Sequence, residues 1–417
     1  MTRTHDLVVW GATGVAGRLV ASYLAERYEP ETLSLALGGR DRARLEQLEA
    51  RLTDREPAWD SIPLVLGDAT DPASLEAIAA ETAVVCTTVG PYTTYGTPMV
   101  AACVEHGTDY CDLTGEVTWA RQMIDRFHEP ARAAGARIVN SCGFDSVPTD
   151  LSTLLAQEEA LATVGAPCQR VRIYLEDAQG SVSGGTLASF AELFETAATD
   201  PEAAAALQNP YSLAPPGERE GPDPGGQRRP VADPMGAGWT APSPMAGVNE
   251  RVVRRSNALL GYPWGESFAC TEVVPTGDGI GGAVGAAAVT GGLGLFVAAM
   301  GVGPIRAGLR RFVFPQPGEG PSEAETTEGH FRVRARGTGE TEAGEFAVDA
   351  IVAADRDPGY GATARMLAEA GICLLREETQ SDLEGGVLTP ASAIGSPLAD
   401  RLDGAGFTTS AELVETP

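Results

Sequence analysis

The sequence predicts an α/β protein with an N-terminal Rossmann domain, a doubly wound parallel sheet, followed by a second part of different, α+β character. Up to about residue 160, short apolar segments alternate with stretches of helical periodicity. A glycine-rich turn follows the first apolar segment and opens a helical stretch. Beyond residue 160 this alternation stops, and a proline-rich region separates longer segments. These three observations together predict the fold class.

The apolar segments of the first part are short and nearly continuous, as in strands covered on both faces of a parallel sheet. Residues 1–150 are therefore expected to form the Rossmann domain. We expect strands at 7–10, 33–37, 63–67, 83–89, 109–113 and 137–142, with helices between them, for example at 42–52 and 72–81.

Residues 151–385 are expected to form the α+β domain, which would hold substrate or a dimer contact. A strand at 169–175 and a helix at 184–198 begin it, and 330–337 with 345–355 resemble an antiparallel pair. Residues 200–250 hold ten prolines and little periodicity, so we expect a Pro/Gly-rich loop or lid. The C-terminal segment 386–417 is expected to pack back on the Rossmann domain.

The stretch 279–305 is apolar, with no charge between Asp278 and Arg306. It is long enough to span a bilayer, but glycine and alanine dominate it and Pro304 closes it. We favour a soluble helix that is buried against the sheet or lines a pocket for an apolar ligand. A membrane span or a peripheral lipid contact is the alternative.

The charge and the basic residues exclude several functions. The formal net charge is −27 and is spread along the chain, which disfavours nucleic acid and anionic membrane surfaces as partners and indicates a halophilic source. All 30 basic residues are arginine. Without lysine, the chain cannot use a lysine base or the Tyr-x-x-x-Lys dyad of short-chain dehydrogenases.

The cysteines and histidines favour a reducing compartment and no metal. Seven cysteines are scattered without a C-x-x-C pair, and four histidines are isolated. The N-terminus enters a strand within seven residues and lacks a signal-peptide pattern. We therefore expect a cytoplasmic protein without a metal site, with membrane association as the alternative and a homodimer left open.

A glycine motif predicts the nucleotide site. The strand at 7–10 runs into the turn "GATGVAG", which opens the next helix. The glycines permit a tight turn, close approach of a pyrophosphate and close helix packing, while the helix N-terminus favours phosphate. The expected cofactor-binding residues are Gly11, Ala12, Thr13, Gly14, Val15 and Gly17.

The end of the second strand selects the nucleotide. An NAD site usually has an acidic residue there, whereas this chain has Arg40 in "LGGRDRAR", which suits the 2′-phosphate of NADP(H). Asp41 lies one residue late and is expected to cap the following helix. Asp68, after the third strand, is expected either to bind the adenine amino group or to cap a helix.

Residues 87–98 follow the fourth strand, at the crevice where the cofactor of a doubly wound sheet lies. Thr88, Val89 and Gly90 are expected to border the nicotinamide ribose. Tyr92 and Tyr95 are the nearest phenols and either one is a candidate proton donor, with a packing role as the alternative.

The stretch "VNSCGFDSVPTDL" follows the sixth strand. Pro148 and Asp150 are explained by the start of a helix, with Thr149 or Asp150 as its cap. The other residues are candidates for the nicotinamide edge and the substrate head group. We predict cofactor contacts for Cys142, Gly143 and Phe144, and catalytic roles for Asp145 and Ser146 besides Tyr92.

Several motifs together resemble the saccharopine dehydrogenase-like oxidoreductases, and most closely the branch of the trans-acting enoyl reductases. They are "VVWGATGVAGR", "LGGR", "TTVGPYTTYGTPMVAACVEHGTDYCDLTGE", "NSCGFDSVPTDL", "SGGTLAS" and "DPGYGATARMLAEAG". The resemblance implies a Rossmann domain with an inserted α+β domain, NADPH as reductant, and reduction of a C=C bond in a lipid-like or polyketide chain. The absence of lysine departs from the acid–base residues of true saccharopine dehydrogenases.

The resulting hypothesis is hydride transfer from NADPH to the β-carbon of an activated alkene, followed by protonation of the α-carbon. Backbone N–H groups at 143–146, with Ser146 or Tyr92, are expected to stabilise the enolate. Two rivals stay open: an imine or ketone reductase on the same scaffold, and a nucleotide-binding, lipid-associated protein without turnover. An apolar small molecule is the expected partner, in contact with 279–303.

Overall fold

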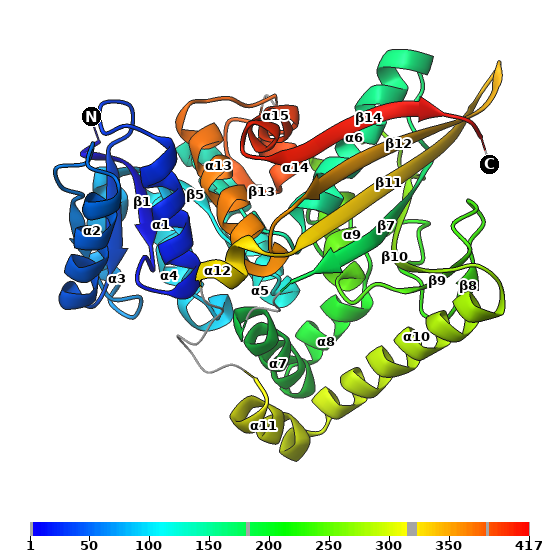
Figure 1. Ribbon diagram of the computed structural model, residues 1–417, viewed down its shortest axis with the longest axis horizontal. Helices are drawn as coiled ribbons and strands as arrows, with labels where there is room; N and C mark the ends of the chain where they lie inside the picture. Colours follow the sequence, from blue (N-terminus) through cyan, green and yellow to red (C-terminus); the bar gives the residue numbers. More distant parts are fainter. Residues whose placement is uncertain (1–2, 181–183, 315–322, 381–382, 417) are drawn as a thin grey trace.

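The computed structural model describes residues 3–180, 184–314, 323–380 and 383–416, which form two seven-stranded sheets side by side (Figure 1). The first sheet is parallel, in the order β13-β6-β5-β4-β1-β2-β3. From β3 to β6 this is the Rossmann order, so the predicted fold class is confirmed. The strands are β1 (His5–Trp10), β2 (Leu35–Gly39), β3 (Leu64–Leu66), β4 (Thr82–Thr87), β5 (Asp109–Cys111), β6 (Arg137–Val139) and β13 (Gly386–Leu388).

Helices cover both faces of this sheet because its strands are apolar on both faces. Leu7 and Val9 of β1 face one core, while Val8 and Trp10 face the other. The first core receives α1 (Val15–Arg27), α2 (Arg42–Arg55) and α13 (Thr363–Leu375); the second receives α3 (Pro72–Glu81), α4 (Tyr92–His106) and α5 (Val117–Ala134). Asp41 caps α2 as predicted, accepting from the Arg44 amide at 3.2 Å.

Two elements of the first layer come from the end of the chain. Helix α13 packs against β1, β4 and β5, although its residues were assigned to the second domain from sequence. Gly371 allows this close approach, since a Cβ there would lie 2.3 Å from Cys86 Sγ. The C-terminal segment contributes to both sheets. Its first strand, β13, pairs with β6 of the first sheet. After α14 (Pro390–Ala393) and α15 (Ser396–Gly404), strand β14 (Phe407–Val414) pairs with β12 of the second sheet.

The second sheet is mixed, in the order β14-β12-β11-β7-β10-β9-β8. Only β7 and β10 pair in parallel; the other neighbours are antiparallel. Helix α6 (Val147–Val164), which follows β6 after one turn, packs on β11, β12 and β14, and so connects the two sheets. The remaining strands are β7 (Arg170–Gln179), β8 (Val231–Ala232), β9 (Trp239–Pro242), β10 (Ala269–Gly277), β11 (His330–Thr341) and β12 (Gly344–Ala354).

The proline-rich region is more ordered than a loop or lid. It contains α8 (Pro201–Gln208), β8, β9 and the start of α9 (Ala246–Leu259), and its longest stretch without a helix or strand is 209–230. Buried arginines hold this part: Arg251 donates to the Asn209 carbonyl at 3.0 Å, and Arg254 pairs with Asp223 at 2.6 Å. Residues 315–322 lie outside the described residues, and α12 (Glu323–Thr327) follows them. One turn of π-helix, η1 (Pro358–Ala362), precedes α13.

The apolar stretch forms α10 (Gly279–Gly301), and the prediction of a buried helix is wrong. By length and composition α10 is suited to cross a membrane, yet only 11% of its most apolar window is buried in the fold. Its first turns pack on β9 and β10, and its far end meets α11 (Gly303–Phe312) and α7 (Gly184–Thr199), away from the two sheets (Figure 1). The helix buries only Gly282, Ala286 and Met300.

Candidate active site

The glycine turn after β1 has the close packing and the free first-turn amides that were predicted for a phosphate site. Gly11 has φ of +87°, and a Cβ on Gly17 would lie 2.2 Å from the Gly11 carbonyl oxygen. Gly14 precedes the first residue of α1, Val15, without a side-chain cap. The amides of the first helical turn are therefore left for an anion.

The end of β4 lies against this turn, as predicted from the strand order. A Cβ on Gly11 would meet Val89 Cγ2 at 2.7 Å and Thr88 Oγ1 at 2.9 Å. The Thr88 hydroxyl also donates to the Gly11 carbonyl at 3.3 Å. Thr88 and Val89, with Gly90 behind them, thus border the crevice between β1 and β4.

The two residues predicted near the adenosine half have different surroundings. Arg40 follows β2 and is exposed to solvent. Asp68 accepts from the Thr70 amide at 2.8 Å and the Thr70 hydroxyl at 2.7 Å, and these bonds lower its pKa. Asp68 therefore stabilises its own turn, while Asp71 caps α3 by accepting from the Ala73 amide. The adenine contact of Asp68 stays a prediction.

Replacing Arg40 by alanine is expected to raise the Kd for NADPH about 10- to 100-fold, because one charge-assisted pair with the 2′-phosphate is lost. The Kd for NADH should change less than twofold. Fluorescence titration with both nucleotides measures this, with Arg42→Ala as a control, since Arg42 is exposed and pairs with Glu46 at 3.8 Å. Equal effects on both nucleotides would remove Arg40 from the 2′-phosphate site.

A buried carboxylate holds the ends of β5 and β6 together. Asp112 accepts from the Thr114 and Ser141 amides, both at 3.0 Å, from Asn140 Nδ2 at 2.7 Å and from the Tyr110 hydroxyl at 3.0 Å. Its carbonyl accepts from the Cys142 amide at 2.7 Å. The turn at 140–146 is therefore shaped from the neighbouring strand.

In this conformation, fewer groups of the turn are accessible to a ligand than the sequence predicted. Cys142 is wholly buried in the hydrophobic core, so the prediction that it contacts the cofactor is wrong. A Cβ on Gly143 would lie 3.0 Å from Leu113. The Phe144 amide donates to Thr363 Oγ1 at 3.0 Å, and the Ser146 amide to the Gly143 carbonyl at 3.1 Å. These two amides are not available to an enolate.

Tyr92 and Ser146 are also buried, and each hydroxyl has a protein partner. The Tyr92 hydroxyl donates to the Thr87 carbonyl at 3.2 Å and accepts from the Leu113 amide at 3.1 Å, and burial raises its pKa well above the usual value. Tyr92 thus packs as a structural residue, and its predicted role as proton donor is wrong. The Ser146 hydroxyl donates to Asn249 Oδ1 at 3.0 Å, inside the protein. Tyr95 is half-buried in the first turn of α4 and stays a prediction.

Asp150 has a different role from the predicted helix cap. It lies within α6, accepts from Ser256 Oγ at 2.6 Å and from the Ala391 amide at 2.9 Å, and so ties α6 to α9 and α14. Burial raises its pKa to about 6. Asp150 is a structural anchor that links distant parts of the chain.

The raised pKa of Asp150 predicts a pH dependence of stability. An unfolded aspartate titrates near ~4, so between that pH and about 6 the folded state binds more protons. Its contribution to the free energy of unfolding is complete below ~4 and is lost as the pH rises to 6. From pH 4 to 7, we expect the free energy of unfolding of wild type to fall by roughly 2–3 kcal/mol relative to that of Asp150→Asn, which does not titrate at this position. Urea unfolding at several pH values measures it; parallel curves would contradict it.

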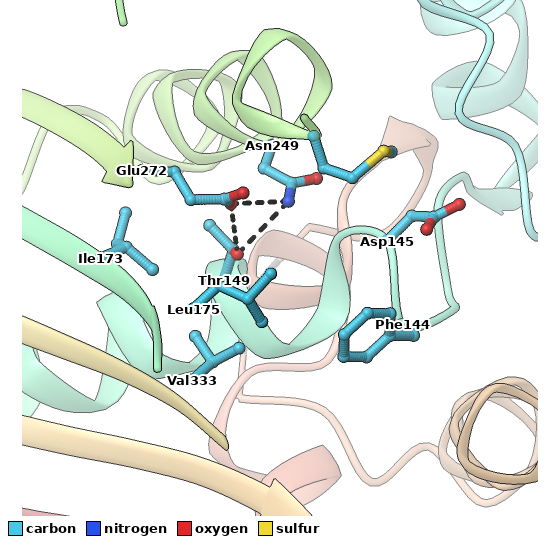
Figure 2. A pocket seen from close by; sticks show the side chains of 9 residues that line it. Phe144, Asp145, Thr149, Ile173, Leu175, Asn249, Glu272 and Val333 are labelled. Carbon is cyan, nitrogen blue, oxygen red and sulfur yellow. Dashed lines mark hydrogen bonds between the residues drawn. The ribbon is translucent and has the colours of Figure 1, made fainter. Parts of the chain in front are cut away.

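A pocket lies where the turn after β6 meets the second sheet. It is a hollow of about 290 Å³, counted with the solvent space at its mouth. Figure 2 shows Phe144 and Asp145 at one side, with Thr149, Asn249 and Glu272 together at the other. Its remaining wall is apolar and consists of Ile173, Leu175, Met245 and Val333.

The polar end of the pocket centres on Glu272. Its Oε2 accepts from Asn249 Nδ2 at 2.6 Å and Thr149 Oγ1 at 2.8 Å, and Ser243 donates to its Oε1. Burial raises the pKa of Glu272, although these hydrogen bonds oppose the shift. A buried carboxyl with a raised pKa at the end of an apolar pocket is a site where a proton can be held for transfer.

The sequence analysis missed this polar end. Thr149, Asn249 and Glu272 come from α6, α9 and β10, and no spacing in the sequence connects them. The one available signal was a lone carboxylate in the apolar strand "ACTEVV". Across the described ranges, no group of three or more His, Cys, Asp or Glu side chains is placed to hold a metal ion.

Comparisons with known proteins show the family and the fold of the chain. The saccharopine dehydrogenase NADP binding domain family matches residues 7–139. A putative trans-acting enoyl reductase of Mycobacterium tuberculosis is 41% identical over 416 residues, 97% of each chain. A trans-acting enoyl reductase of Mycobacterium bovis is 39% identical over 421 residues, again 97% of each chain. The saccharopine dehydrogenase (L-Glu forming) of Saccharomyces cerevisiae shares the fold, with a TM-score of 0.52 at 13% identity, covering 99% of this chain and 100% of that one.

Proposed function

The chain belongs to the saccharopine dehydrogenase-like oxidoreductases, among the relatives of the trans-acting enoyl reductases, and on that premise we propose that it reduces a C=C bond of a lipid-like or polyketide substrate. It is an NADP-dependent oxidoreductase, and NADP(H) is its cofactor. The rival hypothesis of a protein without turnover is therefore set aside. The observation that supports a lipid-like or polyketide substrate is the pocket, because it has an apolar wall and one polar end.

The reaction needs two additions to the double bond. When bound, NADPH would supply a hydride to the β-carbon of the activated double bond, and the protein would supply the proton that the α-carbon takes up. The residues that would hold the nucleotide are the glycine turn at Gly11–Gly17 and the end of β4 at Thr88–Gly90. Phe144, Ile173 and Leu175 would then exclude water from the alkene.

Two carboxyl groups border this pocket, and we assign the role of proton donor to Glu272. It is buried, its pKa is raised, and Thr149 and Asn249 orient it through hydrogen bonds. Asp145, for which the sequence predicted a catalytic role, lies across the pocket beside Phe144 and is half-buried. It remains the alternative donor.

Glu272→Gln is expected to lower kcat about 100-fold, as for loss of a general acid, with the Kd for NADPH unchanged. Steady-state NADPH oxidation on a panel of enoyl thioesters, ketones and imines measures this and identifies the reaction. Asp145→Asn is the matched comparison. A large loss with Asp145→Asn and none with Glu272→Gln would assign the proton to Asp145. Turnover of ketones or imines alone would replace the alkene hypothesis.

A further inference from the structure

The α10–α11 arm, residues 279–313, is the largest apolar feature that the fold leaves uncovered. Its far end is fixed to α7 by a small cluster in which Ala191, Met300 and Phe314 are buried. Beyond that cluster the apolar side chains face solvent. Ile280 is 85% exposed, Phe312 80% and Leu295 73%, joined by Val284, Val289, Val297, Val302, Ile305 and Val313. Soluble monomers rarely expose a continuous apolar surface of this kind.

Within the arm, helix α10 is apolar around its whole circumference. No charged residue occurs from 279 to 305. At about 100° per residue, Ile280, Val284 and Leu295 share one side of α10, whereas Val289 and Val297 lie on other sides. One helix of a second copy would cover a single side only. A lipid phase surrounds a helix on all the sides that the protein leaves open.

The sheet topology excludes a simple membrane crossing. Strand β10 ends at Gly277 before the arm, β11 begins at His330 after it, and both pair with β7. The chain must therefore return to the side from which it left. Residues 302–329 hold three arginines and four glutamates, which no second crossing would accept. The arm can only enter a bilayer from one face.

The charges of the arm oppose those of the whole chain. Between Asp278 and Glu319 the only charged residues are Arg306, Arg310 and Arg311, in a chain of net charge −27. Glu195 lies 3.4 Å from Arg310 and offsets part of its charge. The Arg311 guanidinium lies 5.3 Å from the centre of the Phe312 ring, so charge and aromatic surface occur together. This pairing suits the headgroup region of an anionic bilayer.

We propose that the α10–α11 arm docks the protein on an anionic lipid bilayer, with Leu295 and Phe312 among the acyl chains and Arg306 and Arg311 at the headgroups. The docking would bring the reductase to a surface where lipid-like molecules are concentrated. The proposal rests on the arm alone and stands whatever substrate the pocket takes.

Flotation with phosphatidylglycerol–phosphatidylcholine vesicles tests this proposal, with phosphatidylcholine vesicles beside them, at the lowest salt that keeps the protein folded. Wild type should float with the anionic vesicles. Leu295→Asp/Phe312→Glu and Arg306→Gln/Arg311→Gln should each weaken binding at least tenfold. The control Leu161→Asp changes an exposed leucine on α6, 40% exposed, and should float like wild type. Phe312→Trp should shift its emission to the blue on adding anionic vesicles.

Other outcomes would overturn the proposal. Wild type that stays unbound, or arm variants that float like wild type, would show that the arm does not dock on lipid. A wild-type dimer in light scattering that the arm variants dissociate, without vesicle binding, would identify the arm as a contact between two copies. NADPH titration of each variant checks folding and separates these results from a failure of the proposed reaction.

Discussion

Gly17→Ala is expected to abolish NADPH binding, with a Kd raised at least about 100-fold. The added Cβ would lie 2.2 Å from the Gly11 carbonyl oxygen, 2.8 Å from its carbon and 2.9 Å from Ala12 Cα. All three are backbone atoms, so no side chain can yield, and α1 must move away from the turn. This movement would displace the first-turn amides that receive the pyrophosphate.

The same change should lower the free energy of unfolding by about 2–4 kcal/mol, since α1 packs in the first core. NADPH fluorescence titration and urea unfolding measure the two effects. Gly14→Ala is the graded control: its Cβ would meet the Gly11 oxygen at 3.3 Å, and its φ of −72° suits alanine. A Gly17→Ala variant that binds NADPH within threefold of wild type would show that the cradle does not depend on this contact.

Asp112→Ala is expected to cost about 3–5 kcal/mol of stability and to remove turnover. It would leave two buried amides, of Thr114 and Ser141, without their acceptor, at roughly 1–3 kcal/mol each. The turn at 140–146 would lose its side-chain connection to the end of β5 and keep the backbone bond of Cys142 to Asp112, so Phe144 and Asp145 should shift in the pocket wall. Urea unfolding and steady-state NADPH oxidation report the two losses.

The matched control is Asp109→Ala, at the other end of the same strand. Asp109 pairs with Arg137 and accepts from its amide at 2.8 Å, remote from the carboxyl ends of the strands. Its loss should destabilise the protein while the remaining folded enzyme keeps its kcat. Equal kcat for the two variants, measured where both are folded, would show that Asp112 supports the fold and not the site.

The parallel sheet and its nucleotide turn could be read from local sequence, because the signals are short-range. A strand buried on both faces is a continuous apolar run, and the turn that follows requires glycine at Gly11 and Gly17 for steric reasons within seven residues. Asp41 as a helix cap is equally local. The NADP preference was predicted from one residue, Arg40, and the NADP-binding family supports it.

The polar cluster after β6 was misjudged because burial is not visible locally. The sequence separated Asp150, as a structural residue, from Cys142, Asp145 and Ser146. It did not show that Cys142 packs in the core or that Asp150 anchors α9 and α14. The prediction for helix α10 was wrong in the opposite direction. Its apolar composition predicted burial, whereas the fold leaves it exposed.

The chain alone specified the α/β class, the glycine cradle and an arginine suited to NADP(H), since each depends on residues that are neighbours along the backbone. The polar end of the pocket could be recognised only in the tertiary structure. Thr149, Asn249 and Glu272 are separated by up to 123 residues, and meet because α6 crosses from the first sheet to the second. Burial then raises the pKa of Glu272, and no single segment carries that information.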